Sequence, residues 1–108
     1  MKYFHDEIIS RWNNFSIYEQ MANIGAEVGR AIKWKNKNQK IFLNAFYRAL
    51  ELIDLTAADK KNHHRLSEIL RLRETIADFL VGDNIYKQTE KQIEKYFYYF
   101  TLAARENK

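Results

Sequence analysis

Apolar residues recur at spacings of three and four in four separate segments of this chain, and this periodicity constrains the fold more than any other feature. In the first segment, five such residues fall on one stripe of a helix. They are Ile17, Met21, Ile24, Val28 and Ile32. The chain has no proline and only three glycines to break such segments. The pattern indicates an all-α protein.

The first two predicted helices have recognisable ends. Ser16 and Glu19 have the spacing of a capping box, in which each side chain bonds the backbone amide of the other residue. They predict a helix that runs from there to about Trp34. Residues 35–40 are all polar and predict a loop, in which Asn38 can cap a second helix that reaches about Ala58.

The third and fourth predicted helices have similar signals. A polar interruption carries Asp59 and Asn62, either of which can cap a third helix. Gly82 follows the last apolar residue of that helix and is expected to stop it in the left-handed conformation. Residues 89–92 repeat the capping-box pattern before a fourth helix, which ends near Arg105.

Short polar connections between four amphipathic helices favour antiparallel neighbours. We therefore expect residues 16–108 to form one up-down-up-down four-helix bundle. Residues 1–15 form an N-terminal extension, in which Phe4, Ile8 and Trp12 have helical spacing. This segment either closes over the open end of the bundle or docks on a neighbouring subunit, and the sequence leaves both alternatives open.

Several functional classes lack their required residues. Without cysteine the chain has no disulfide and no thiolate metal site. No apolar segment approaches the roughly 20 residues that cross a bilayer, so we expect a cytoplasmic protein without a membrane partner. His63 and His64 are adjacent, and side chains about 100° apart on a helix do not share one metal ion. With no catalytic or phosphate-loop motif, we expect neither an enzyme nor a cofactor.

The charge distribution suggests a polyanionic partner. The formal net charge is +4, and lysine and arginine side chains neutralise nucleic-acid phosphates. One basic cluster contains an indole that could stack on an exposed base. Its residues are Arg30, Lys33, Trp34, Lys35, Lys37 and Lys40. Alternatively, this segment is a solvated loop beside a tryptophan that plugs the end of the bundle.

A second basic group is predicted at the opposite end of the bundle. It consists of Lys60, Lys61 and Arg65, beside Arg105 and Lys108. Antiparallel topology would also bring Lys87 and Lys91 to the end that carries the first cluster. Both ends would then be positive, which suits nucleic acid and equally suits a merely soluble surface.

Other residues suggest contacts between subunits. Residues 96–100 are all aromatic, and on a helix they must project in every direction. We expect Tyr98 and Tyr99 at an interface, together with Trp12, and a homo-oligomer. Gly25 and Gly29 make a smooth face on the first helix. Tight packing inside the bundle explains this face more simply than a subunit contact does.

The order of parts resembles a known family of small four-helix bundles. The resemblance rests on S-I-Y-E-Q opening the first helix, a lysine-rich loop, and the run R-A-L-E-L-I-D-L-T-A-A-D-K-K-N-H-H-R-L-S-E-I-L-R-L-R-E. The family contains the ribosomal-RNA intervening-sequence proteins and the accessory variability (Avd-like) proteins of diversity-generating retroelements. The resemblance implies a basic, ring-forming, commonly pentameric bundle that binds nucleic acid and, for the accessory variability proteins, a reverse transcriptase.

Two functions follow as expectations. The first is a non-enzymatic accessory protein that binds RNA or DNA through the two basic groups and assists a reverse transcriptase. The second is a protein-interaction adaptor without nucleic-acid binding, whose contacts run through Trp12, Tyr98 and Tyr99.

Overall fold

The computed structural model describes residues 6–106, with side chains from residue 8 onward, and all its regular elements in this part of the chain are helices. They are α1 (Asp6–Asn13), α2 (Ile17–Trp34), α3 (Gln39–Ala58), the 3-10 helix η1 (Lys60–Arg65), α4 (Leu66–Val81) and α5 (Glu90–Glu106). The prediction of an all-α fold is confirmed. The four long helices begin and end close to the predicted positions.

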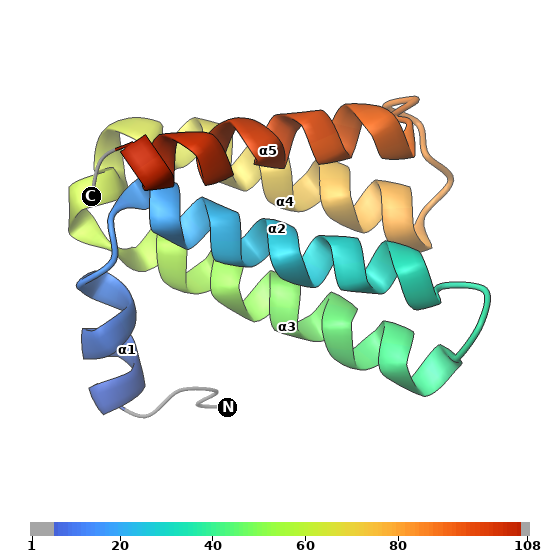
Figure 1. Ribbon diagram of the computed structural model, residues 1–108, viewed down its shortest axis with the longest axis horizontal. Helices are drawn as coiled ribbons and strands as arrows, with labels where there is room; N and C mark the ends of the chain where they lie inside the picture. Colours follow the sequence, from blue (N-terminus) through green and yellow to red (C-terminus); the bar gives the residue numbers. More distant parts are fainter. Residues whose placement is uncertain (1–5, 107–108) are drawn as a thin grey trace.

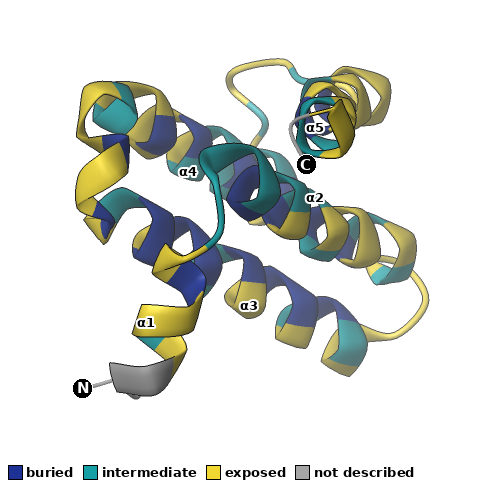
Figure 2. Ribbon diagram, turned by 60° about the vertical axis from the view of Figure 1, so that its left-hand side comes forward, coloured by how far each residue is buried: buried dark blue, intermediate teal, exposed yellow. Residues whose placement is uncertain are grey.

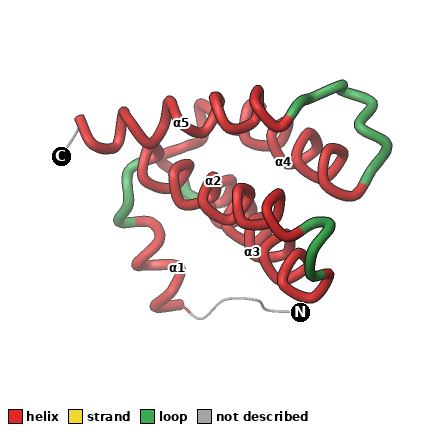
Figure 3. The backbone as a smooth tube through the Cα atoms, turned by 45° about the vertical axis from the view of Figure 1, so that its right-hand side comes forward, coloured by secondary structure: helices red, strands yellow, loops and turns green. Residues whose placement is uncertain are grey.

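The long helices lie side by side as a bundle (Figure 1). Helix α2 has its closest backbone contacts with α3 and then α5, and α3 also packs against α4. The connection between α2 and α3 lies at the same end of the molecule as the loop between α4 and α5 (Figure 3). Helix α1 lies apart from the bundle axis and packs against α3.

The core forms where the apolar stripes of the helices meet. Met21, Ile24 and Val28 of α2 are at most 1% exposed, as their spacing requires. Gly25 sits on the same helix, where an added Cβ would lie 2.7 Å from the Cβ of Phe97. The predicted tight packing inside the bundle is therefore found at Gly25. It is not found at Gly29, where an added Cβ would meet nothing within 4 Å.

The predicted capping residues form their expected hydrogen bonds. The Ser16 hydroxyl accepts from the Glu19 amide, and the Glu19 carboxylate accepts from the Ser16 amide, both at 3.1 Å. Asn38 Oδ1 accepts from the Ile41 amide at 3.1 Å. Thr89 and Gln92 exchange the same pair of bonds at the start of α5. Local sequence therefore fixes the helix starts.

Two predictions about connections are wrong. Gly82 follows α4 but has a φ of −94°, and the left-handed residues are instead Asn84 and Lys87. A glycine is still required, because an added Cβ would lie 3.0 Å from the Asp78 backbone. The prediction that Asp59 or Asn62 caps the third long helix is also wrong, because the helix η1 follows α3, and α4 begins after Arg65, which makes no side-chain capping bond. Asp59 caps η1 by accepting from the Lys61 amide at 3.2 Å.

Helix α1 packs against α3 of its own chain. Trp12 is 7% exposed, and its indole lies edge-on to Phe15 with ring centroids 5.7 Å apart. Of the two alternatives for residues 1–15, the position of Trp12 favours closure over the bundle. Phe4, which shares the predicted spacing, lies outside the described residues.

Candidate nucleic-acid interface

A tight turn joins α2 to α3 and presents lysine side chains to solvent. The Trp34 carbonyl, at the end of α2, accepts from the amides of Lys37 and Asn38, both at 3.0 Å. Helix α3 starts directly afterwards, so the chain reverses within a few residues. Lys37 and Lys40 are both exposed on this turn.

Acidic residues are absent from a long stretch around this turn. Between Glu27 and Glu51 the sequence contains no aspartate and no glutamate. The first turn of α3 is consequently free of acid, although helix N-termini usually attract one because their amides carry partial positive charge. The lysines and the helix end therefore add to the same positive potential.

The predicted cations of the first cluster differ in what they contact. Arg30 pairs with Glu27 at 3.7 Å. The Lys35 ammonium donates to the Phe79 carbonyl at 3.4 Å, which ties it to the last turn of α4. Lys37 and Lys40 make no ion pair or side-chain hydrogen bond with any described residue. The ammonium groups of these two lysines are therefore not engaged by any described residue.

Less of the Trp34 ring is available for stacking on a base than the sequence suggested. Its ring is half-buried and packs against the core, and the Lys33 ammonium lies 5.5 Å from the ring centroid. This position agrees with the alternative in which Trp34 plugs the end of the bundle. Little of the indole remains for stacking on a base.

The loop between α4 and α5 adds the exposed Lys87, and the first turn of α5 adds the exposed Lys91, at the same end (Figure 3). The Asp78 carboxylate holds this loop by accepting from the backbone amides of Ile85 at 3.0 Å and Tyr86 at 3.1 Å. Both connections therefore lie at the same end of the molecule (Figure 3).

At the opposite end, two of the three predicted contact residues are engaged within the chain. Lys61 forms an ion pair with Asp59 and donates to the Asn13 carbonyl at 2.9 Å. Arg65 pairs with Glu68 at 3.2 Å. Lys60 is exposed and has no partner among the described residues. This end offers much less free positive charge than its sequence suggests.

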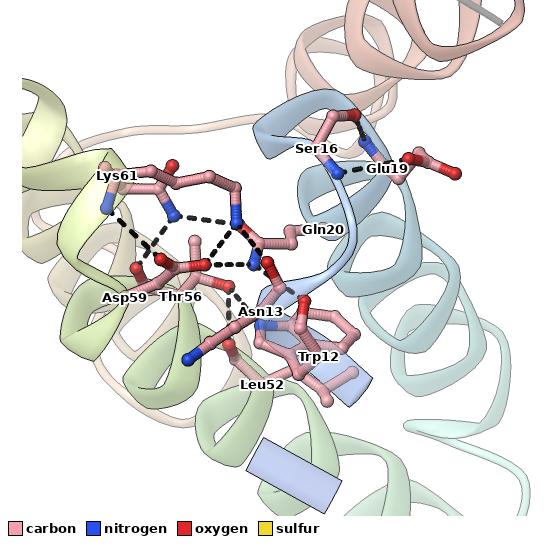
Figure 4. A network of polar contacts seen from close by, with 10 residues as sticks. Trp12, Asn13, Ser16, Glu19, Gln20, Leu52, Thr56, Asp59 and Lys61 are labelled. Carbon is pink, nitrogen blue, oxygen red and sulfur yellow. Dashed lines mark hydrogen bonds and ion pairs between the residues drawn. The ribbon is translucent and has the colours of Figure 1, made fainter. Parts of the chain in front are cut away.

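A buried polar network, which sequence reasoning missed, occupies this end (Figure 4). Gln20 is fully buried and donates to the Trp12 carbonyl at 3.0 Å and to Asp59 Oδ2 at 2.9 Å. Asn62 donates to Gln20 Oε1 at 2.8 Å, and the Trp12 indole donates to Thr56 Oγ1 at 3.1 Å. Every buried side-chain nitrogen and oxygen in the described part of the chain has a partner.

The charge of Asp59 is stabilised within this network. Burial alone would raise its pKa, but hydrogen bonds from Lys61 and Gln20 and the Lys61 charge outweigh burial. The pKa of Asp59 is therefore lowered from its ordinary value of 3.8, and the carboxylate stays ionised.

The predicted interface residues separate into two groups. Trp12 is buried and bonded inside its own chain, so it has almost no surface to offer another subunit. Its predicted role at an interface is contradicted by this burial. Tyr98 and Tyr99 are each 58% exposed, while Phe97 and Phe100 beside them are buried. The expectation that part of the aromatic run emerges is confirmed.

A groove of about 280 Å³ between α4 and α5 has a mainly apolar lining. Tyr96 lies at its rim and donates to Glu68 at 2.9 Å. Burial, together with this hydrogen bond, raises the pKa of Tyr96 far above its ordinary value. The phenol therefore remains protonated and donates a hydrogen bond, rather than acting as a base near neutral pH.

Residues 6–106 form neither a cluster of metal ligands nor a membrane-spanning helix. No group of three histidine, aspartate or glutamate side chains comes together there as a metal site, and His63 and His64 are both exposed. No helix in this range has the length and apolar character to cross a bilayer.

The outer face of α3 contains exposed residues that sequence reasoning did not select. Asn44, Tyr47 and Arg48 all face solvent, and Tyr47 is 56% exposed. Their only signal in the sequence is the absence of acidic residues, which continues past the lysine-rich turn as far as residue 50.

Comparisons with protein-family models, curated proteins and solved structures found no match to this chain.

Proposed function

We propose that this protein is a non-enzymatic, basic helical accessory protein that binds nucleic acid through the end of the bundle formed by the α2–α3 turn. The observation that carries this proposal is the acid-free stretch between Glu27 and Glu51, within which Lys37 and Lys40 are exposed and form no ion pair with any described residue. Phosphates would displace only water and counterions from these ammonium groups, because no internal ion pair has to break.

Further positive charge lies at the same end of the bundle. Lys33, Lys87 and Lys91 are exposed there, and the α3 N-terminus contributes its dipole. Contacts of this kind recognise the phosphate backbone and carry no direct information about base sequence. The proposal includes an up-down-up-down arrangement of α2 to α5, which brings both connecting loops to this end. The proposal does not extend to assistance of a reverse transcriptase.

A salt titration of affinity tests this function. The logarithm of the association constant should fall linearly with the logarithm of salt concentration. Replacing Lys37 or Lys40 by alanine should reduce the slope by about one each. Lys60→Ala, which removes an exposed lysine at the opposite end of the bundle, is the matched control and should leave the slope unchanged. A salt-independent affinity, or equal effects of all three variants, would refute phosphate binding at this end.

The second candidate is a protein-interaction adaptor, and the exposure of Tyr98 and Tyr99 on α5 favours it. Tyrosine contributes large contact areas at protein interfaces. These residues could join copies of this chain in a homo-oligomer or receive another protein. Sedimentation of the Tyr98→Ala/Tyr99→Ala double variant tests the homo-oligomer, which should dissociate if these side chains hold it together.

A further inference from the structure

The outer face of α3 forms a continuous exposed strip. Asn44 and Tyr47 follow Lys40 by four and seven residues, so on a helix of 3.6 residues per turn they lie within about 40° of its direction. Arg48 lies about 80° from Lys40 and about 12 Å further along the helix. All four residues are exposed. The solvent-facing edge of α3 is visible along the helix in Figure 2.

The charged side chains of this strip, Lys40 and Arg48, are both positive. Helix α3 has no acidic residue before Glu51, which is half-buried. The strip is continuous with the unpaired lysines of the α2–α3 turn. At its other end, Arg48 lines a hollow of about 440 Å³ together with Arg11 of α1 and with Glu27, whose carboxylate pairs with Arg30. Neither Arg48 nor Arg11 forms an ion pair with a described residue, so free positive charge extends from the turn toward α1.

Tyr47 is the aromatic side chain that this strip offers to a ligand. Its ring is 56% exposed and rests against Phe46, with centroids 5.4 Å apart. Its hydroxyl makes no hydrogen bond with a described residue. Tyr86 and Tyr96 differ, because their hydroxyls donate to Glu74 and Glu68. Tyr47 therefore combines an open ring with a hydroxyl that no described carboxylate accepts from, and the first acidic residue along α3, Glu51, lies one turn further on.

The geometry points to a track for single-stranded nucleic acid along the outer face of α3. Phosphates bind Lys37, Lys40 and Arg48, and an unstacked base lies on the ring of Tyr47. Cationic side chains interleaved with an exposed aromatic ring are the usual combination for single strands. A duplex keeps its bases paired and stacked, so it cannot offer a base face to Tyr47. This inference rests on the proposed nucleic-acid function and assigns its strand type and stacking residue.

Fluorescence anisotropy with labelled oligothymidine, labelled oligouridine and a DNA duplex of equal length tests the track. Tyr47→Ala should weaken binding of both single strands by about tenfold, the order expected for one lost stacking contact. Tyr47→Phe keeps the ring and should retain the affinity. Leu70→Ala removes a similarly exposed large side chain from α4, outside every proposed contact surface, and should have no effect. The duplex should bind more weakly and should not respond to Tyr47→Ala.

A charge reversal gives a second, independent measurement. Arg48→Glu should weaken single-strand binding, whereas Arg71→Glu on the exposed face of α4 should change it much less. Because these side chains are on the surface, the melting temperatures should stay close to that of the unaltered protein.

The outcomes separate the two proposals. If no oligonucleotide binds at low salt, the nucleic-acid function itself is wrong. If binding remains sensitive to salt and to Lys37→Ala but Tyr47→Ala has no more effect than Leu70→Ala, the function stands and the α3 track is wrong. Equal affinities for duplex and single strands would also overturn the track.

Discussion

The two ends of the molecule are both rich in basic residues, yet they use them differently. At the end formed by η1, Lys61 and Arg65 are held by Asp59 and Glu68. At the end formed by the α2–α3 turn, Lys37 and Lys40 have no partner among the described residues. The difference follows from the position of acidic residues in the chain. Unpaired charge, rather than the number of lysines, distinguishes a contact surface for a polyanion.

The η1 end is organised for internal cohesion. Gln20 connects α1 with the segment after α3, and the network around it leaves no buried polar side-chain atom unpaired in the described chain. Such networks specify one arrangement, because any lost member leaves its partners buried without hydrogen bonds. The α2–α3 end has no comparable buried network.

The largest expected loss of stability comes from replacing Gln20, which lies at the centre of the network. Gln20→Ala removes one of the two hydrogen bonds that the Trp12 carbonyl accepts, the other coming from the Phe15 amide at 3.1 Å. It also deprives Asp59 and Asn62 of one partner each and opens a small cavity. The free energy of unfolding should fall by about 3 kcal/mol, measured by urea denaturation. A loss below about 1 kcal/mol would mean that this network does not hold α1 in place.

A smaller effect is expected for Lys61, which anchors Asp59 and the Asn13 carbonyl. Lys61→Ala should destabilise the protein by about 1.5 kcal/mol, while Lys60→Ala, its exposed neighbour, should change stability by less than about 0.5 kcal/mol. Equal effects of these two substitutions in thermal or urea unfolding would show that Lys61 is not engaged in solution.

The stability that the η1 end contributes should also depend on pH. Because the pKa of Asp59 is lower in the folded chain than its ordinary value of 3.8, ionised Asp59 contributes stability above that value. This contribution is lost as pH falls through the lowered pKa. Urea denaturation between pH 6 and 2, with Asp59→Asn as reference, measures it. The variant should lose this part of the pH dependence. Identical pH profiles would contradict the assignment.

The smallest effect on stability is expected at the α2–α3 end. Lys37→Ala should alter the free energy of unfolding by less than about 0.5 kcal/mol, because no contact with a described residue is removed. The same variant should still lower the salt dependence of oligonucleotide affinity by about one unit of slope. A marked loss of stability would show that Lys37 has an internal partner and that the contrast between the ends is false.

Local sequence was sufficient for much of the fold. The capping box at Ser16 and Glu19 acts over three residues, and the apolar stripe of α2 needs only helical periodicity, so both could be predicted. Gly82 was misjudged because its requirement comes from contact with the Asp78 backbone. The helix η1 was missed because its residues are polar and show no apolar period, although Asn62 is 2% exposed.

The candidate site was only partly predictable. The lysine-rich turn was visible as a charge cluster, but the half-burial of Trp34 and the carbonyl contact of Lys35 depend on the packing of α2 against α4. Tyr47 carries no distinguishing motif. Its relevance emerges once the face of α3 is known to be exposed along its length.

The sequence by itself determined the helices, their starting caps and the long acid-free stretch, because these depend on residue spacing and on contacts within one or two turns. Only the tertiary structure decided that Lys35 and Lys61 donate to backbone carbonyls, since Phe79 lies 44 residues after Lys35 and Asn13 lies 48 residues before Lys61. It also decided that Trp12 is internal, because its indole reaches Thr56, which lies 44 residues further along the chain. Partners so distant in sequence become neighbours only through packing.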